Sequence, residues 1–218
     1  MNAKQLKGQM EMEKDFGIKL PSPPPPLLYP SKATTLPIVV NLFGAPGAGK
    51  STGAAYIFSM LKMAGFNAEL ITEYAKDKTW EENFKALKNQ AYLFGEQSYK
   101  MSCCADKVDV IVTDSPLLLN IIYNNDTRLT DNFNATVIDV FNSYCNMNYF
   151  ISRNKKYNPV GRNQTESEAS QIGKQILKML NKNSFDYENV EGSLTGYNYI
   201  VDKVSTQIKL YYNTIEGN

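Results

Sequence analysis

A nine-residue loop constrains the fold of this chain more than any other feature of the sequence. It reads GAPGAGKST at residues 44–52 and has the spacing G-x-x-x-x-G-K-[ST]. Residues 38–43, immediately before it, form a short apolar run rich in β-branched side chains, which is typical of a buried parallel strand. After the loop, apolar residues recur at helical spacing. A strand, a glycine-rich loop and a helix in this order predict a phosphate-binding P-loop.

The residue types of the loop suit the binding of a polyphosphate. Glycines let the backbone turn so that successive N–H groups point inward, and the positive end of the following helix adds to the attraction. Lys50 is expected to reach the β- and γ-phosphates of ATP, and the Ser51 hydroxyl to bind Mg²⁺. The predicted nucleotide-binding residues are Gly44, Ala45, Pro46, Gly47, Ala48, Gly49, Lys50, Ser51 and Thr52.

Composition narrows the chemistry further. The 218 residues carry a net charge of +1, so no overall field attracts the protein to nucleic acid or to an anionic membrane, although a local basic patch remains open. There is no histidine, which excludes histidine triads, histidine general bases and histidine-bound zinc. The three cysteines argue against a disulfide framework and for a reducing compartment. Because no apolar run is long enough to span a membrane, we expect a cytoplasmic protein.

The remaining pattern predicts an α/β fold. Residues 1–35 are expected to be an N-terminal extension with a proline-rich strap (PSPPPP), and residues 36–212 the domain that contains the P-loop. Strands are expected at 38–43, 68–72, 108–114, 147–152 and 185–191, and helices after the P-loop and at 80–104, 131–146, 165–180 and 196–210. This alternation predicts a three-layer P-loop NTPase fold, with about five parallel strands and helices on both faces.

Three charged residues follow predicted strands and therefore belong at the ligand-binding edge of the sheet. Asp114 is expected to accept hydrogen bonds from Mg²⁺-bound waters, its alternative role being an ordinary strand-end cap. Glu73 is expected to accept a proton or hydrogen bond from an attacking hydroxyl, unless it is a surface glutamate, in which case Asp77 is a substitute. Arg153 begins a basic segment at 153–163.

That basic segment is predicted to be a lid over ATP. It contains two of the three arginines of the chain, Arg153 and Arg162, together with Lys155 and Lys156. Guanidinium groups neutralise the charge that develops during phosphoryl transfer, and a closing lid excludes water. A solvated basic loop is the alternative. The predicted catalytic residues are thus Lys50, Glu73, Asp114, Arg153 and Arg162.

The positions of the arginines also bear on the phosphoryl acceptor. No arginine occurs between residues 36 and 127, where enzymes that phosphorylate nucleoside monophosphates usually hold the acceptor phosphate, although Lys76 or Lys78 could substitute. This favours a neutral, hydroxyl-bearing acceptor. Candidates to stack on or hydrogen-bond a base are Tyr74, Trp80, Asn83, Gln90 and Gln97.

Several blocks together resemble a known family over residues 36–210. They are residues 44–52, Thr72-Glu73-Tyr74, the VTDSP run at 112–116 and the YNPVGR run at 157–162, followed by QTESEA at 164–169. The chain resembles P-loop nucleoside and nucleotide kinases, of the ribosylnicotinamide kinase-like or thymidylate kinase-like type and of the kind carried by bacteriophages. The resemblance implies that residues 36–212 are a P-loop kinase domain that uses ATP and Mg²⁺ and transfers the γ-phosphoryl group, in a host cytoplasm if the chain is phage-encoded. Ser115 stands where monophosphate kinases often carry arginine.

The leading hypothesis is therefore a kinase that phosphorylates a hydroxyl of a small nucleoside-like molecule. Other hypotheses are a kinase acting on a hydroxymethylated base (5-hydroxymethyluracil) in phage DNA, a nucleoside monophosphate kinase, and a nucleotide-dependent switch ATPase with no acceptor. No Asn-Lys-x-Asp sequence supports a GTP switch. An oligomeric motor ATPase has only Arg128 as a further arginine finger. The sequence leaves the oligomeric state open.

Overall fold

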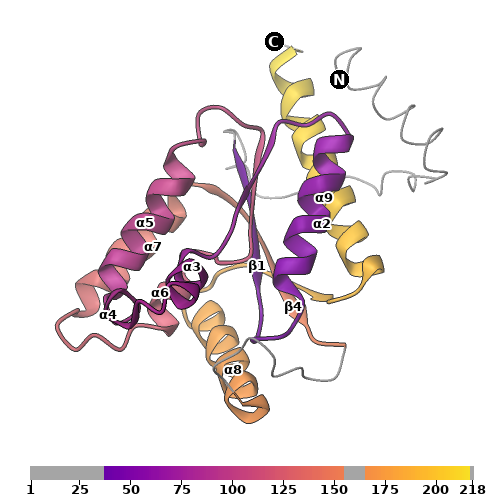
Figure 1. Ribbon diagram of the computed structural model, residues 1–218. Coiled ribbons are helices and arrows are strands. Elements are labelled where there is room, and N and C mark those ends of the chain that lie inside the picture. Colours follow the sequence, from indigo (N-terminus) through magenta and orange to yellow (C-terminus); the bar gives the residue numbers. More distant parts are fainter. Residues whose placement is uncertain (1–36, 155–164, 217–218) are drawn as a thin grey trace.

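Five parallel strands form the centre of the molecule (Figure 1). The computed structural model describes residues 37–154 and 165–216, so the predicted N-terminal strap lies outside the described residues. The strands are β1 (Ile38–Phe43), β2 (Ala68–Ile71), β3 (Val110–Thr113), β4 (Cys145–Ser152) and β5 (Glu188–Glu191). They lie side by side in the order β2-β3-β1-β4-β5, and every neighbouring pair is parallel. The predicted five-stranded parallel sheet is confirmed.

Helices cover both faces of the sheet, because successive side chains of a strand point to opposite faces. In β1, Val40 and Leu42 join a core cluster with residues of α2 (Lys50–Met63) and α9 (Leu194–Glu216). Val39 and Phe43 join a second cluster on the other face. Its helices are α5 (Gln90–Ser102), α6 (Leu119–Ile122), α7 (Asp131–Asn142) and α8 (Glu166–Lys182). The three-layer α/β architecture follows from these two cores.

The single long helix predicted at 80–104 is wrong. The structure has α3 (Tyr74–Trp80), which was not predicted and ends where the predicted helix begins, followed by the two separate helices α4 (Phe84–Leu87) and α5. Glu82 adopts a φ of 54° between α3 and α4, which ends the helical path. The side chains of Asn83 and Asn89 then cap α4 and α5 by accepting hydrogen bonds from Ala86 N and Tyr92 N. Asparagine favours such caps over helix interiors, so the apolar periodicity alone was misleading.

Other boundaries differ from the predictions by a few residues. The helix predicted at 131–146 ends earlier because β4 begins at Cys145, and α9 extends beyond the predicted 196–210. The short α6 was not predicted. At the start of α8, Thr165 and Glu168 form the predicted capping box. Among the described helices, none combines the length and apolar character that crossing a bilayer requires.

Candidate functional site: the P-loop and the strand ends beside it

The P-loop connects β1 to α2 through backbone conformations that glycine adopts readily. Gly44, Gly47 and Gly49 have φ values of 146°, 84° and 99°. A Cβ atom on Gly44 would lie 2.6 Å from the carbonyl oxygen of Ile151, a backbone atom of the neighbouring strand β4. The loop therefore has no room for a side chain at this position, and the predicted turn of the backbone is present.

Tyr197 of α9 contacts the loop, and no local sequence pattern predicts this contact. Its hydroxyl donates a hydrogen bond to the carbonyl oxygen of Gly49 over 3.0 Å. A Cβ atom on Gly53, in the first turn of α2, would lie 2.5 Å from Cε1 of the same ring. The only trace in the sequence is a glycine inside a helix, where glycine is otherwise unfavourable.

The side chain of Lys50 folds back onto the backbone of the P-loop. Lys50 Nζ donates to the carbonyl oxygens of Gly44 and Ala45 over 2.9 and 3.3 Å. Ser51 and Thr52 are exposed in the first turn of α2, whereas Ala48 is buried. An ammonium group, exposed hydroxyls and the start of a helix thus meet at one point, which is an arrangement that attracts anions.

The structure brings Glu73 and Asp114 together at the carboxyl ends of β2 and β3. The two strands pair with Ile71 opposite Thr113, so the residues that follow them lie side by side. The backbone N–H of Glu73 donates to Asp114 Oδ1 over 3.2 Å, and Asp114 is only 5% exposed. Because Thr113 also pairs with Asn41 of β1, both carboxyl groups lie beside the P-loop.

The electrostatics of Glu73 link it to the P-loop lysine. Burial raises the pKa of its carboxyl, the nearby Lys50 ammonium opposes the rise, and the Asp114 carboxylate adds to it. Burial and the charge of Glu73 also raise the pKa of Tyr123 to about 12. Tyr123 therefore lies within electrostatic range of Glu73, which the sequence did not indicate, since only the folding of the chain brings the two together.

The model of a family described as AAA domain matches residues 39–195, which include β1, the P-loop, Glu73 and Asp114. The chain belongs to this AAA-domain family. A search of curated proteins finds no match. The family match and the fold confirm that this AAA-domain protein is a P-loop nucleotide-binding protein with a kinase-like fold.

Solved structures similar to this AAA domain include nucleoside and nucleotide kinases. Thymidylate kinase from Ehrlichia chaffeensis is 12% identical, with a TM-score of 0.53 over 78% of this chain and 97% of that chain. Deoxyadenosine kinase from M. mycoides with dCMP and a flexible dCDP bound is 18% identical, with a TM-score of 0.42 over 83% of this chain and 100% of that chain. The same enzyme with dATP is 20% identical, with a TM-score of 0.42 over 82% and 99%. At 12% identity, the similarity to the thymidylate kinase concerns the fold alone.

The predicted lid is described only at its first residues. Arg153 follows β4, and its Nη1 donates to Glu166 Oε1 over 3.1 Å at the start of α8. Arg162 lies outside the described residues. The third arginine, Arg128, forms a two-point contact with the Asp126 carboxylate, with donor–acceptor distances of 2.8 and 2.6 Å. A motor-type arginine finger at Arg128 would first have to leave this pair.

Of the five residues predicted to contact a base, Gln97 has the clearest unused hydrogen-bonding capacity. It is 3% exposed, and its Oε1 accepts a hydrogen bond from the backbone N–H of Tyr74 over 3.0 Å, while its Nε2 donates to no described atom. Gln90 is bonded to Asn120, and Asn83 caps α4. A buried N–H group without an acceptor is unfavourable, so Gln97 Nε2 is suited to donate a hydrogen bond to an acceptor atom of a ligand.

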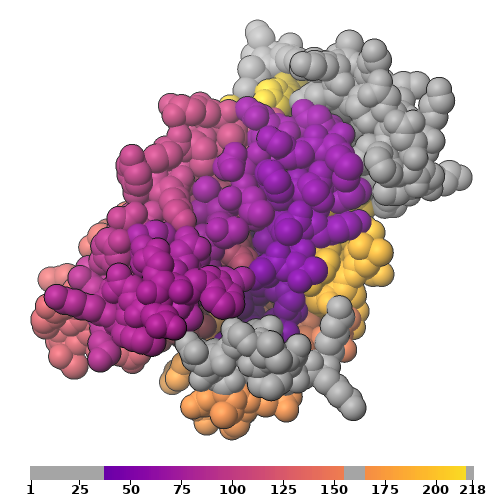
Figure 2. Space-filling view, in the orientation of Figure 1, coloured from indigo at the N-terminus to yellow at the C-terminus, as the bar shows by residue number. Residues whose placement is uncertain are grey.

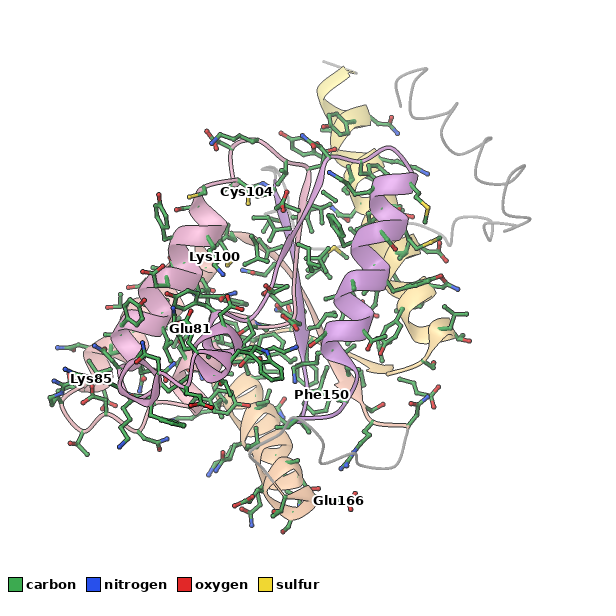
Figure 3. The ribbon with its side chains drawn as sticks, viewed as in Figure 1. Glu81, Lys85, Lys100, Cys104, Phe150 and Glu166 are labelled. Carbon is green, nitrogen blue, oxygen red and sulfur yellow. The ribbon has the colours of Figure 1, made fainter. Side chains whose placement is uncertain are left out.

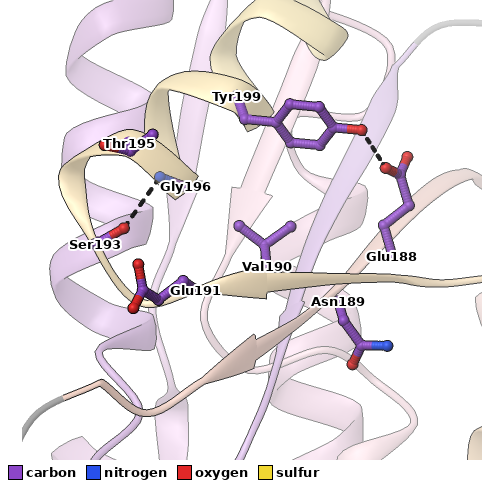
Figure 4. Close-up of a pocket in the computed structure, with 8 residues that line it drawn as sticks. All are labelled: Glu188, Asn189, Val190, Glu191, Ser193, Thr195, Gly196 and Tyr199. Atoms are coloured by element: carbon purple, nitrogen blue, oxygen red, sulfur yellow. Dashed lines mark hydrogen bonds between the residues drawn. The ribbon is translucent and has the colours of Figure 1, made fainter.

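A separate hollow of about 370 Å³ lies between the edge strand β5 and the start of α9 (Figure 4). On one side of the hollow, the Tyr199 hydroxyl donates a hydrogen bond to Glu188 Oε2. On the other side, the backbone N–H of Gly196 donates a hydrogen bond to Ser193 Oγ. None of its lining residues belongs to the P-loop or to the predicted catalytic set. The hollow is therefore distinct from the P-loop site.

Proposed function

We propose that this AAA-domain protein is an ATP- and Mg²⁺-dependent phosphotransferase that moves the γ-phosphoryl group to a hydroxyl of a nucleoside-like acceptor. The observation that carries the proposal is Glu73, a carboxyl group within electrostatic range of Lys50 and adjacent to Asp114. A carboxylate beside a phosphate group is unfavourable unless it accepts a proton or a hydrogen bond from the attacking group. The position of Glu73 thus favours a hydroxyl acceptor over nucleotide binding alone.

The chain's own residues divide the reaction between them. The acceptor oxygen attacks the γ-phosphorus, the bond from that phosphorus to the oxygen shared with the β-phosphate breaks, and ADP leaves. The proton of the hydroxyl passes to the Glu73 carboxylate, whose raised pKa makes it a stronger base than an ordinary carboxylate. Loop N–H groups and Lys50 hold the phosphates. Arg153 and Arg162 are proposed to neutralise charge on the transferred group.

Ser51 and Asp114 are the residues proposed to hold Mg²⁺. A hydroxyl and a carboxylate are hard oxygen ligands of the kind Mg²⁺ takes together with waters and phosphate oxygens. Within the described residues no group of three or more acidic or cysteine side chains forms a metal cage. When bound, the metal would supply charge neutralisation at the phosphates.

A neutral acceptor is favoured over a monophosphate. Of the two lysines that could bind an acceptor phosphate, Lys78 is held by Glu81 through contacts of 2.8 Å to both carboxylate oxygens, and the charge of Lys76 acts on the Glu73 carboxyl, whose pKa it lowers. Gln97, in contrast, offers an unused donor beside Tyr74, the residue that follows Glu73. We propose that this amide donates to a base of the acceptor while Glu73 faces its hydroxyl.

Substitution of Glu73 tests the proposal, with Glu69 as a matched control. Glu69 lies on β2 only four residues earlier, and its side chain is exposed. Phosphoryl transfer from radiolabelled ATP would be measured against nucleosides, nucleoside monophosphates and single-stranded DNA with or without 5-hydroxymethyluracil. Glu73→Gln should lower kcat by about 10²- to 10⁴-fold, the usual contribution of a general base, with little change in Mg·ATP affinity. Glu69→Gln should behave as the unaltered protein.

Other outcomes identify the competing functions. Label on monophosphates alone would assign the protein to the nucleoside monophosphate kinases and remove the role given to Glu73. ATP turnover that is the same with and without every acceptor would indicate a switch ATPase. Label only on the modified DNA would narrow the acceptor to the hydroxymethylated base.

A further inference from the structure

Two aromatic rings project into solvent where α3 turns into α4. Trp80 is 73% exposed and Phe84 is 65% exposed. The backbone N–H of Asn83 donates to the carbonyl oxygen of Lys78 over 2.9 Å, so the chain turns back beside the end of α3 and places Phe84 after the turn. Large apolar groups lose favourable free energy when they remain in water, and a neighbouring pair of them marks a surface that binds something.

Lysines accompany the two rings. Lys85 and Lys88 lie on or next to α4 and are both exposed, and neither forms an ion pair within the part of the chain that the structure describes. Residues 84 and 88 are four apart in a helical segment, which places Phe84 and Lys88 on one side. Of the acidic groups on and just after α3, Glu81 pairs with Lys78 and Asp77 pairs with Lys100, which leaves Glu82 without a described ion pair. We call Trp80, Phe84, Lys85 and Lys88 the α3–α4 platform.

The platform lies at the opposite end of α3 from Glu73 of the proposed active site. Glu73 is the N-cap residue of α3, and Trp80 is its last residue. A helix rises 1.5 Å per residue, so about 10 Å of helix separates them. The α3–α4 region projects from the lower left of the molecule in Figure 2. In Figure 3, Glu81 and Lys85 lie on the same lower side as Phe150, near the end of β4, whereas Cys104 lies toward the top.

We infer that the α3–α4 platform binds a single-stranded nucleic acid, so that the nucleoside-like acceptor of the proposed function is a residue of a strand. Flat aromatic rings stack on unpaired bases, and lysines attract the phosphates between those bases. Bases of a duplex are stacked on each other and present no free face to the rings. The inference rests on the proposed function for the reaction, but the binding itself is independent of catalysis.

Trp80 provides a direct measurement because it is the only tryptophan of the chain. Its fluorescence would be titrated with a single-stranded oligothymidylate of about 12 nucleotides, within the usual site size of such proteins. We expect the oligonucleotide to quench the emission and a duplex of the same length to leave it unchanged. Phe84→Ala should weaken the affinity by about 5- to 150-fold, the usual effect of removing one stacking ring. Replacing Lys85 and Lys88 by Gln should reduce the salt dependence of binding.

Tyr99→Ala is the matched control. Tyr99 is 66% exposed, nearly the same as Phe84, but it lies near the other end of α5, next to Cys103 and away from the platform. Its removal should leave the oligonucleotide affinity unchanged. Equal effects of Phe84→Ala and Tyr99→Ala, or equal binding of single strand and duplex, would overturn the inference.

Two further results would also overturn it and point elsewhere. Emission that changes with protein concentration but not with oligonucleotide would show that a second copy of the chain covers the platform. If the protein phosphorylates a free nucleoside and its Trp80 emission does not respond to the oligonucleotide, the inferred nucleic-acid binding at the platform is wrong and the proposed function stands. Quenching by the oligonucleotide without phosphoryl transfer to any acceptor would instead reject the proposed function and retain the platform.

Discussion

Replacing Gly53 by alanine should destabilise the protein, although helix propensity alone indicates the opposite. Gly53 lies in the first turn of α2, and alanine inside a helix is more stable than glycine by about 1 kcal/mol. A Cβ atom at this position, however, would lie 2.5 Å from Cε1 and 2.9 Å from Cδ1 and Cζ of Tyr197. Carbon atoms in favourable contact are about 3.5–4.0 Å apart, so the ring or the helix must move.

The ring of Tyr197 has little freedom to move. It is 5% exposed, and its hydroxyl is tied to Gly49 O. Forcing an extra methyl group into a packed core costs about 1–3 kcal/mol. The higher helix propensity of alanine offsets about 1 kcal/mol of this cost, so the free energy of unfolding should fall by up to about 2 kcal/mol. For a chain of this size each kcal/mol shifts Tm by about 2–4 °C, so we expect Tm to fall by several degrees.

Gly95→Ala is the matched control, measured with Gly53→Ala by thermal and urea unfolding. Gly95 is also inside a helix, α5, but a Cβ atom there would meet nothing within 4 Å. Gly95→Ala should therefore stabilise the protein by about 1 kcal/mol through the higher helix propensity of alanine, and Tm should rise by a few degrees. In a Tyr197→Ala background the cost of Gly53→Ala should disappear, which isolates the ring as its cause. If Gly53→Ala stabilises the protein as Gly95→Ala does, the reasoning from the Tyr197 contact is refuted.

Three further predictions concern the site and the fold. Lys50→Ala should weaken Mg·ATP binding by about 10-fold or more in calorimetry, as for a lost charged hydrogen bond, whereas Lys62→Ala at the exposed end of α2 should not. Burial raises the pKa of Glu73 above its ordinary 4.5, so its protonated form stabilises the fold at low pH and this stability is lost as pH rises through the folded pKa. Glu73→Gln should therefore unfold at a higher temperature than the unaltered protein at pH 8 but not below pH ~4.5; a constant difference across pH would contradict this. Thr165→Ala removes the capping box that Thr165 forms with Glu168, and should lower the free energy of unfolding in urea by about 1 kcal/mol; an unchanged free energy of unfolding would show that the cap does not stabilise α8.

The sequence by itself determined the features that are encoded by neighbouring residues. The spacing around Lys50 specified the P-loop, because loop geometry and helix start depend on adjacent backbone conformations. The apolar run that ends at Asp114 indicated that this carboxyl group lies at the end of a strand, and the structure places it beside the P-loop. The alternation of strands and helices was enough to specify the parallel sheet.

The tertiary structure decided what depends on residues far apart in the chain. Tyr197 supports Gly49 from 148 positions away, and no local pattern encodes such a contact. The raised pKa of Glu73 and its proximity to Tyr123 arise from burial, which is a property of the packed whole. The break at Glu82 likewise replaced a helix that periodicity favoured, because capping by Asn83 and Asn89 outweighed the apolar pattern. Spacing along the chain specified the phosphate site, and packing between distant segments placed the groups that surround it.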